Sequence, residues 1–93
     1  MQLRNCPFIK WPPSWTKIEG DGDADVTGEI GTLKSVSSSR VQPKACYLIV
    51  DVGATSYVGR LVCDNGAVCR RVLALLQRQI GRSIKQIGDL ELA

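Results

Sequence analysis

The strongest structural signal in the chain is a pair of β-forming segments joined by a short turn. Residues 45–52 and 56–63 are rich in β-branched and other apolar residues, and Gly53 and Ala54 lie between them. Two runs of this composition around a short glycine-containing turn predict an antiparallel β-hairpin. Alternate residues of a strand point to opposite faces, so the hairpin has one strongly apolar face. Any fold for this chain must cover that face.

A helix-forming segment, residues 66–80, follows the hairpin. Residues placed about 100° apart around a helix divide here into an apolar arc and a polar arc. The apolar arc, interrupted only by Gln79, consists of Leu75, Val68, Val72, Leu76, Cys69, Ile80 and Leu73. Asp64 or Asn65 is expected to cap the start of the helix, and Gly81 is expected to end it. The division predicts an amphipathic helix whose apolar arc lies on the sheet.

The first 18 residues are predicted to form an extended arm. Pro7, Pro12 and Pro13 forbid a helix here and disfavour a central strand, because proline has no backbone N–H. The arm carries the two tryptophans of the chain, Trp11 and Trp15. Two interpretations of these rings stay open: they cover the sheet, or they offer aromatic contacts to a partner such as a nucleic-acid base.

The remaining segments complete an expected α+β fold in a single domain, residues 1–93. We expect a small antiparallel sheet of three to four strands, with the one amphipathic helix packed on a face and the N-terminal Pro/Trp arm beside it. A helical turn is expected from Ser83, followed by a final strand at 89–92 that pairs within the sheet or forms an exposed edge for a homodimer. In order, the predicted segments are an extended aromatic arm (1–18), an acidic loop (19–27), antiparallel strands (28–63), the helix (64–82), and a short turn with the final strand (83–93).

Four arginines make the polar arc of the helix a candidate face for an anionic partner. Arg70, Arg71 and Arg78 fall within about 100° of one another, and Arg82 extends the row if helical geometry continues that far. No acid lies in the helical segment to neutralise them. Three interpretations stay open: a solvated face, pairing with the acidic loop, or binding of nucleic acid or an acidic protein surface.

The chain contains no histidine. Histidine is the usual general base and the commonest metal ligand, and its absence removes the Ser-His and Cys-His nucleophile pairs. The acids cluster in a glycine-rich loop, where burial does not raise their pKa values. We therefore predict no enzyme activity, no catalytic residue, no cofactor and no metal site.

The four cysteines are spread along the chain at Cys6, Cys46, Cys63 and Cys69. No pair has the close spacing of a structural zinc site. Free thiols are expected; the alternatives are a disulfide, for which Cys63 and Cys69 are suitably placed, and a metal site assembled from distant positions.

The expected function is that of a small binding or regulatory domain, bacterial or phage in type, that acts through another protein. Nucleic-acid binding through the arginine face is the alternative. Residues 1–10 lack the apolar core of a secretory signal, and the longest apolar run, at 45–50, has six residues. A bilayer span needs roughly 20. We therefore expect a cytoplasmic protein with no membrane partner.

Overall fold

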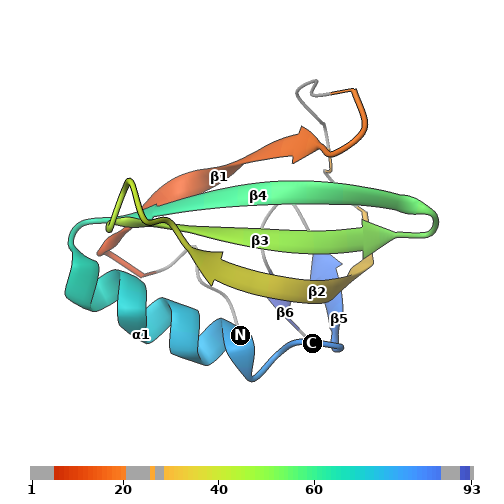
Figure 1. Ribbon diagram of the computed structural model, residues 1–93. Coiled ribbons are helices and arrows are strands. Elements are labelled where there is room, and N and C mark those ends of the chain that lie inside the picture. The colour runs from red at the N-terminus through yellow and green to blue at the C-terminus, as the bar shows by residue number, and fades with distance from the viewer. Residues whose placement is uncertain (1–5, 21–25, 27–28, 87–90, 93) are drawn as a thin grey trace.

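The structure is a computed structural model that describes residues 6–20, 26, 29–86 and 91–92. Its elements are β1 (Ile9–Lys17), β2 (Gly31–Ser38), β3 (Ala45–Val52), β4 (Thr55–Cys63), α1 (Gly66–Gln77), β5 (Ser83–Gln86) and β6 (Glu91–Leu92). The six strands of the described residues form one sheet in the order β1-β4-β3-β2-β5-β6, and all neighbouring pairs are antiparallel. The sheet curls, and α1 lies toward one end of its long strands (Figure 1).

The predicted α+β fold, with a sheet of three to four strands and a helix packed on its face, is wrong. The described residues hold six strands and one helix of 12 residues, so the architecture is mainly a curled antiparallel sheet. Two segments account for most of the difference. Residues 9–17, expected to be an arm, pair with β4, and residues 83–86, expected to be a helical turn, pair with β2.

The strand β1 lies at an edge of the sheet, where a bulge accommodates its prolines. Lys10 pairs with Val62 and Ser14 with Arg60, so residues 11–13 stand opposite a single residue of β4. Proline has no N–H to donate to a β-ladder, but an edge strand pairs on one side only. The prolines therefore direct this segment to the edge and do not exclude it from the sheet.

The strand β5 is defined by one buried side chain. Ile84 is fully buried, and its Cα lies opposite those of Gly31 in β2 and Leu92 in β6. The next residue, Lys85, is exposed, as the two-residue period of a strand requires. Four residues are too few for the sequence to distinguish this period from a helical turn, so pairing with β2 decides the outcome.

The predicted hairpin is present as β3 and β4. Val52 pairs with Thr55, which leaves Gly53 and Ala54 as the two-residue turn. Gly53 has a φ of 59°, a conformation that glycine adopts without steric cost. The hairpin forms the middle of the sheet and carries much of the core.

The core lies on one face of the sheet and includes one side of α1. Its largest fully buried side chains are Leu33, Leu48, Leu61, Leu76, Ile84, Val50, Cys46 and Cys63. Asn65 caps α1, and its Oδ1 accepts a hydrogen bond from the N–H of Val68 at 3.0 Å. Within the described residues no helix is long and apolar enough to span a bilayer.

The helix ends earlier than the sequence predicted. Its last residue is Gln77 and its C-cap is Arg78, whereas the apolar periodicity continued to residue 80. The N–H of Gln79 donates to the carbonyl oxygen of Leu76 at 2.9 Å, which tightens the chain beyond α1 into a turn. Gly81, with a φ of 85°, then turns the chain toward β5.

Candidate functional site

The outer side of α1 presents two arginines with a leucine between them. Arg71, Leu75 and Arg78, which we call the outer row, are spaced by four and three residues and therefore share one side of the helix. The C-cap residue Arg78 keeps helical dihedral angles, so the row is continuous. Both arginines are exposed, and 43 % of Leu75 is exposed.

The exposure of Leu75 corrects the sequence prediction, which placed this residue and Ile80 on the buried arc. Ile80 is 45 % exposed and lies beyond the end of the helix. The residues of α1 that are buried form a narrower strip, which consists of Val68, Cys69, Val72 and Leu76. The apolar residues of this segment therefore span a wider arc of the helix than the strip that is buried against the core.

Arg70 is exposed, but its side chain turns back over the start of the helix. A Cβ atom added to Gly66 would lie 3.5 Å from Nη1 of Arg70 and 3.8 Å from the carbonyl oxygen of Pro43. The Arg70 guanidinium therefore lies near the loop between β2 and β3. It is not aligned with the outer row.

Arg82 is exposed and lies outside the helix. The N–H of Gly81 donates a hydrogen bond to the carbonyl oxygen of Leu33 at 2.7 Å. The N–H of Leu33 in turn donates to the carbonyl oxygen of Arg82 at 3.2 Å. These bonds fix the backbone at Arg82 against β2. The four predicted arginines are thus divided among three places, and only Arg71 and Arg78 share a side of α1.

The arginines have no acidic partner among the side chains that the structure describes. Among those side chains, Lys34 forms an ion pair with Asp51 on the sheet. Nζ of Lys34 and Oδ2 of Asp51 are 3.9 Å apart. The alternative that the acidic loop neutralises the arginines concerns mainly residues 21–25, which lie outside the described residues.

The two tryptophans lie against the core. Trp15 is only 7 % exposed, and a Cβ atom added to Gly59 would stand 2.7 Å from Cζ3 of its ring. Its indole Nε1 is buried and has no hydrogen-bond partner among the described residues. Trp11 is partly buried and packs against the same core. The ring of Trp15 is therefore closed to a stacking partner, and that of Trp11 is only partly open.

Sequence reasoning missed that Arg60 contacts the loop between β2 and β3, the loop near which the Arg70 guanidinium lies. The loop 39–44 folds on Ser39, whose Oγ accepts hydrogen bonds from the N–H groups of Val41 and Gln42 at 3.2 and 2.9 Å. Arg60 of β4 donates a hydrogen bond to the side chain of Gln42. A serine hydroxyl that accepts hydrogen bonds from N–H groups two and three residues later is a common turn, so the turn at Ser39 could be predicted. The sequence does not show that Arg60 reaches this loop.

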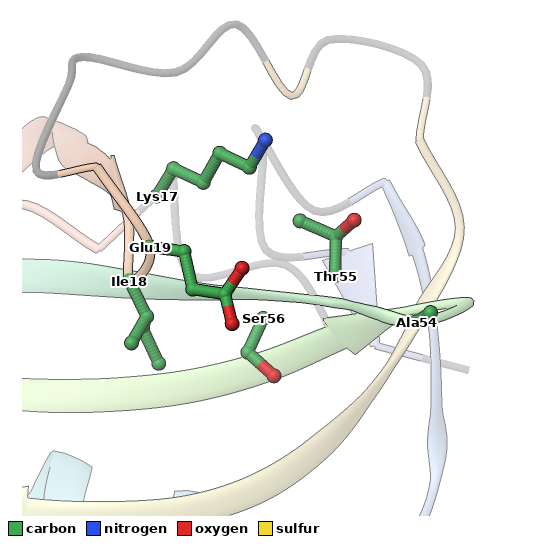
Figure 2. A pocket seen from close by; sticks show the side chains of 6 residues that line it. All are labelled: Lys17, Ile18, Glu19, Ala54, Thr55 and Ser56. Carbon is green, nitrogen blue, oxygen red and sulfur yellow. The ribbon is translucent and has the colours of Figure 1, made fainter.

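A small pocket lies at the other end of the sheet, beside the β3–β4 turn. Figure 2 shows its lining, which consists of Lys17, Ile18, Glu19, Ala54, Thr55 and Ser56. Its volume is about 200 Å³. Ligand pockets usually have volumes of about 300–1,000 Å³ and a mainly apolar lining. This pocket is smaller and carries charges of both signs, so it is a weak candidate for a ligand site.

The thiols of three buried cysteines lie together beneath the start of α1. Burial, followed by repulsion from Cys69 and Cys63, raises the pKa of the Cys46 thiol to about 12. Burial, followed by repulsion from Cys69, raises the pKa of the Cys63 thiol to about 11. Among the described residues, the cysteine and acidic side chains nowhere form a group of three or more that could hold a metal ion.

Comparison with known proteins gives no relative from which a role could be transferred. No family model matches the chain, and neither a curated protein nor a solved structure matches it.

Proposed function

We propose that the protein is a small binding and regulatory domain that docks through the outer row of α1 onto an acidic surface of another protein. One observation supports this above the others: Leu75 is 43 % exposed between two arginines. Covering the exposed part of a leucine contributes roughly 1 kcal/mol. Arginine adds bidentate hydrogen bonds to carboxylates, and it is one of the residues that most often dominate protein interfaces.

The outer row defines the chemistry of the partner. Arg71 and Arg78 are seven residues apart, and this separation corresponds to about 10 Å along a helix. A partner helix matches this spacing when two acids stand seven residues apart and an apolar residue lies between them. Such a helix would pair both arginines and cover Leu75 in one contact.

A protein partner explains the outer row better than a nucleic acid does. A phosphate backbone would pair with the arginines but would leave Leu75 without an apolar contact. Arg70 turns away from the row, and Trp15 is buried, so two of the groups expected to assist nucleic-acid binding lie elsewhere. The net charge of +3 also provides few cations for a contact that needs one for each neutralised phosphate.

Fluorescence anisotropy with three labelled probes of equal net charge tests the proposal. The first probe is a helical peptide with two glutamates seven residues apart and a leucine between them. The second has serine in place of that leucine, and the third is single-stranded DNA. We expect the first to bind most tightly, and Leu75→Ala to weaken it about fivefold with little effect on the second.

A charge-matched control separates the outer row from the net charge. Arg71→Glu and Lys17→Glu change the charge equally, but Lys17 ends β1, away from α1 (Figure 1). Only the first change should abolish peptide binding. If DNA binds most tightly and Arg71→Glu removes that binding, nucleic-acid recognition replaces the proposal. If none of the probes binds at low salt, the outer row is not a binding surface.

We further propose that the protein works in the cytoplasm. The state of its cysteines supports this, because Cys6, Cys46, Cys63 and Cys69 are free thiols. Reducing compartments keep thiols in this form, and oxidising compartments favour disulfides. Fractionation of cells that produce the protein, followed by immunoblotting, tests the location.

A further inference from the structure

Two turns are fixed at the end of the sheet where β4 meets α1. The N–H of Asp64 donates a hydrogen bond to the carbonyl oxygen of Phe8 at 2.9 Å. The N–H of Cys63, the preceding residue, donates to the carbonyl oxygen of Lys44 at 2.7 Å. The turn before β1 and the loop between β2 and β3 are therefore bonded to neighbouring residues, and both lie toward the start of α1 (Figure 1).

Basic residues gather around these two turns. The segments 6–14, 39–46 and 58–70 contain five bases and one acid, Asp64, whereas the rest of the chain contains seven bases and eight acids. The five bases are Lys10, Arg40, Lys44, Arg60 and Arg70. All are exposed except Arg60, which is half-buried. This end of the molecule therefore carries a larger net positive charge than the whole chain does.

Contacts keep several of these bases on one part of the surface. The Cα of Lys10 lies opposite that of Val62 in β4. Arg60 stands two residues before Val62 and points to the same face of the strand. Arg60 also donates a hydrogen bond to the loop between β2 and β3, and the Arg70 guanidinium lies near that loop. Their charges therefore add to one positive field.

Each of the two turns also exposes an apolar side chain. Val41 is 89 % exposed and Phe8 is 51 % exposed. The loop that carries Val41 is held by its own hydrogen bonds, from the N–H of Val41 to Oγ of Ser39 at 3.2 Å and from the N–H of Ala45 to the carbonyl oxygen of Gln42 at 3.0 Å. The fold therefore keeps Val41 in solvent. We call Phe8, Val41 and the five bases the basic end.

We propose that the basic end binds the surface of a membrane that contains anionic lipids, and that Val41 and Phe8 enter the boundary between headgroups and acyl chains. Anionic headgroups match the excess of positive charge, and the boundary below them accepts apolar side chains. The proposal uses residues outside the outer row, so it does not depend on the proposed docking to a protein.

A lipid surface fits the basic end better than a nucleic acid or an acidic protein does. The phosphates of a nucleic acid would pair with the bases but would leave Val41 in water. Val41 and Phe8 stand on separate turns, and a fluid lipid surface receives both without the matched shape that a protein interface needs. The cytoplasmic leaflet is rich in anionic lipids, which agrees with the location proposed above.

This inference departs from the expectation that the chain has no membrane partner. That expectation followed from the lack of a signal and of a spanning segment in the sequence. Contact with the surface of a bilayer requires neither, because charge and a few inserted side chains provide the attraction.

Sedimentation with lipid vesicles tests the proposal on the full-length protein. One preparation contains phosphatidylcholine alone, and the other contains phosphatidylserine as well. We expect the protein to bind the mixed vesicles at least about tenfold more tightly, and the difference to shrink as salt is added. Equal binding to both preparations, or no binding to the mixed vesicles at low salt, would overturn the proposal.

Two pairs of variants at exposed positions test which residues make the contact. Val41→Ser should weaken binding to the mixed vesicles about fivefold, whereas Ile18→Ser, beyond the other end of β1, should leave it unchanged. Lys44→Glu should weaken it at least about tenfold, and the charge-matched Lys17→Glu should weaken it much less. Equal effects within either pair would contradict a contact through the basic end.

Brominated phospholipids quench the fluorescence of a tryptophan that enters the bilayer, and this effect tests insertion. Val41→Trp should be quenched more strongly than the wild type, and Ile18→Trp should not be. Leu75→Ala should bind the mixed vesicles as the wild type does, so a failure of the outer row is distinguishable from a failure here. Single-stranded DNA that binds more tightly than the mixed vesicles, and is released by Lys44→Glu, would assign the basic end to nucleic acid instead.

Discussion

Two adjacent leucines on α1 have opposite environments. Leu76 is fully buried against the sheet, whereas Leu75 is 43 % exposed between Arg71 and Arg78. A rotation of about 100° around the helix axis separates them. The comparison shows that one side of a short helix can stabilise the fold while the side next to it remains available for a partner. Substitutions on the inner side should therefore change stability, and substitutions on the outer row should change binding.

The largest expected effect is that of Leu76→Ala on the inner side. Removal of a fully buried leucine side chain loses its transfer free energy and leaves a cavity. We expect the free energy of unfolding to fall by about 2–5 kcal/mol, measured by urea denaturation. A loss below about 1 kcal/mol would mean that the inner side of α1 does not hold the core.

Alkaline pH should weaken the core that the inner side of α1 covers, through Cys46 of β3. Its pKa is raised from 9.0 to about 12 in the folded protein, so the unfolded chain releases this proton first. The stabilisation is complete below pH 9.0 and is lost as the pH rises toward about 12. Denaturation curves across this range should show a falling free energy of unfolding. Cys46→Ala should reduce the slope, and an unchanged slope in that variant would assign the effect to other groups.

Loss of the helix cap should lower the free energy of unfolding by a smaller amount. The cap stabilises the helix as a whole, so its loss affects the inner side and the outer row alike. The Asn65 side chain accepts the N–H of Val68 at 3.0 Å, and Asn65→Ala removes this bond. We expect a loss of about 1 kcal/mol in thermal or urea denaturation. Asn65→Asp keeps an acceptor and should retain most of the stability. Equal losses in both variants would argue against a capping role.

The smallest change in stability is expected for Leu75→Ala on the outer row. The free energy of unfolding should stay within about 0.5 kcal/mol of the wild type, because the side chain is largely in solvent and alanine favours a helix. Binding of the leucine-containing acidic peptide should nevertheless weaken. Were Leu75→Ala to destabilise the protein as much as Leu76→Ala, the distinction between the two sides would be lost.

The sequence predicted the part of the fold that local patterns encode. The hairpin was readable because β3 and β4 each have eight or more residues of strand composition around Gly53. The strands β1 and β5 were missed for different reasons. The prolines of β1 obscured a strand that has a bulge and lies at an edge, and β5 has four residues whose strand character depends on Ile84 and its pairing with β2.

The candidate site was predicted less completely. The exposure of Arg71 and Arg78 follows from helical periodicity, but Leu75 was assigned to the buried side because its type suggested burial. Arg82 depends on where the helix ends, which backbone hydrogen bonds with Leu33 of β2 help to fix. The gathering of four cysteines from two strand ends, a helix and the segment before β1 depends on the register of the sheet, so the spacing of cysteines in the sequence could not show it.

The bulged edge at β1 affects how the protein behaves when it is concentrated. An open edge strand offers unpaired N–H and C=O groups to the strands of other molecules, and fibrous aggregates grow by such additions. Pro12 and Pro13 have no N–H to offer, and residues 11–13 depart from the regular register that an incoming strand would need. The prolines, because of which the sequence predicted an arm in place of β1, thus protect this edge of the sheet from the addition of strands that builds a fibril.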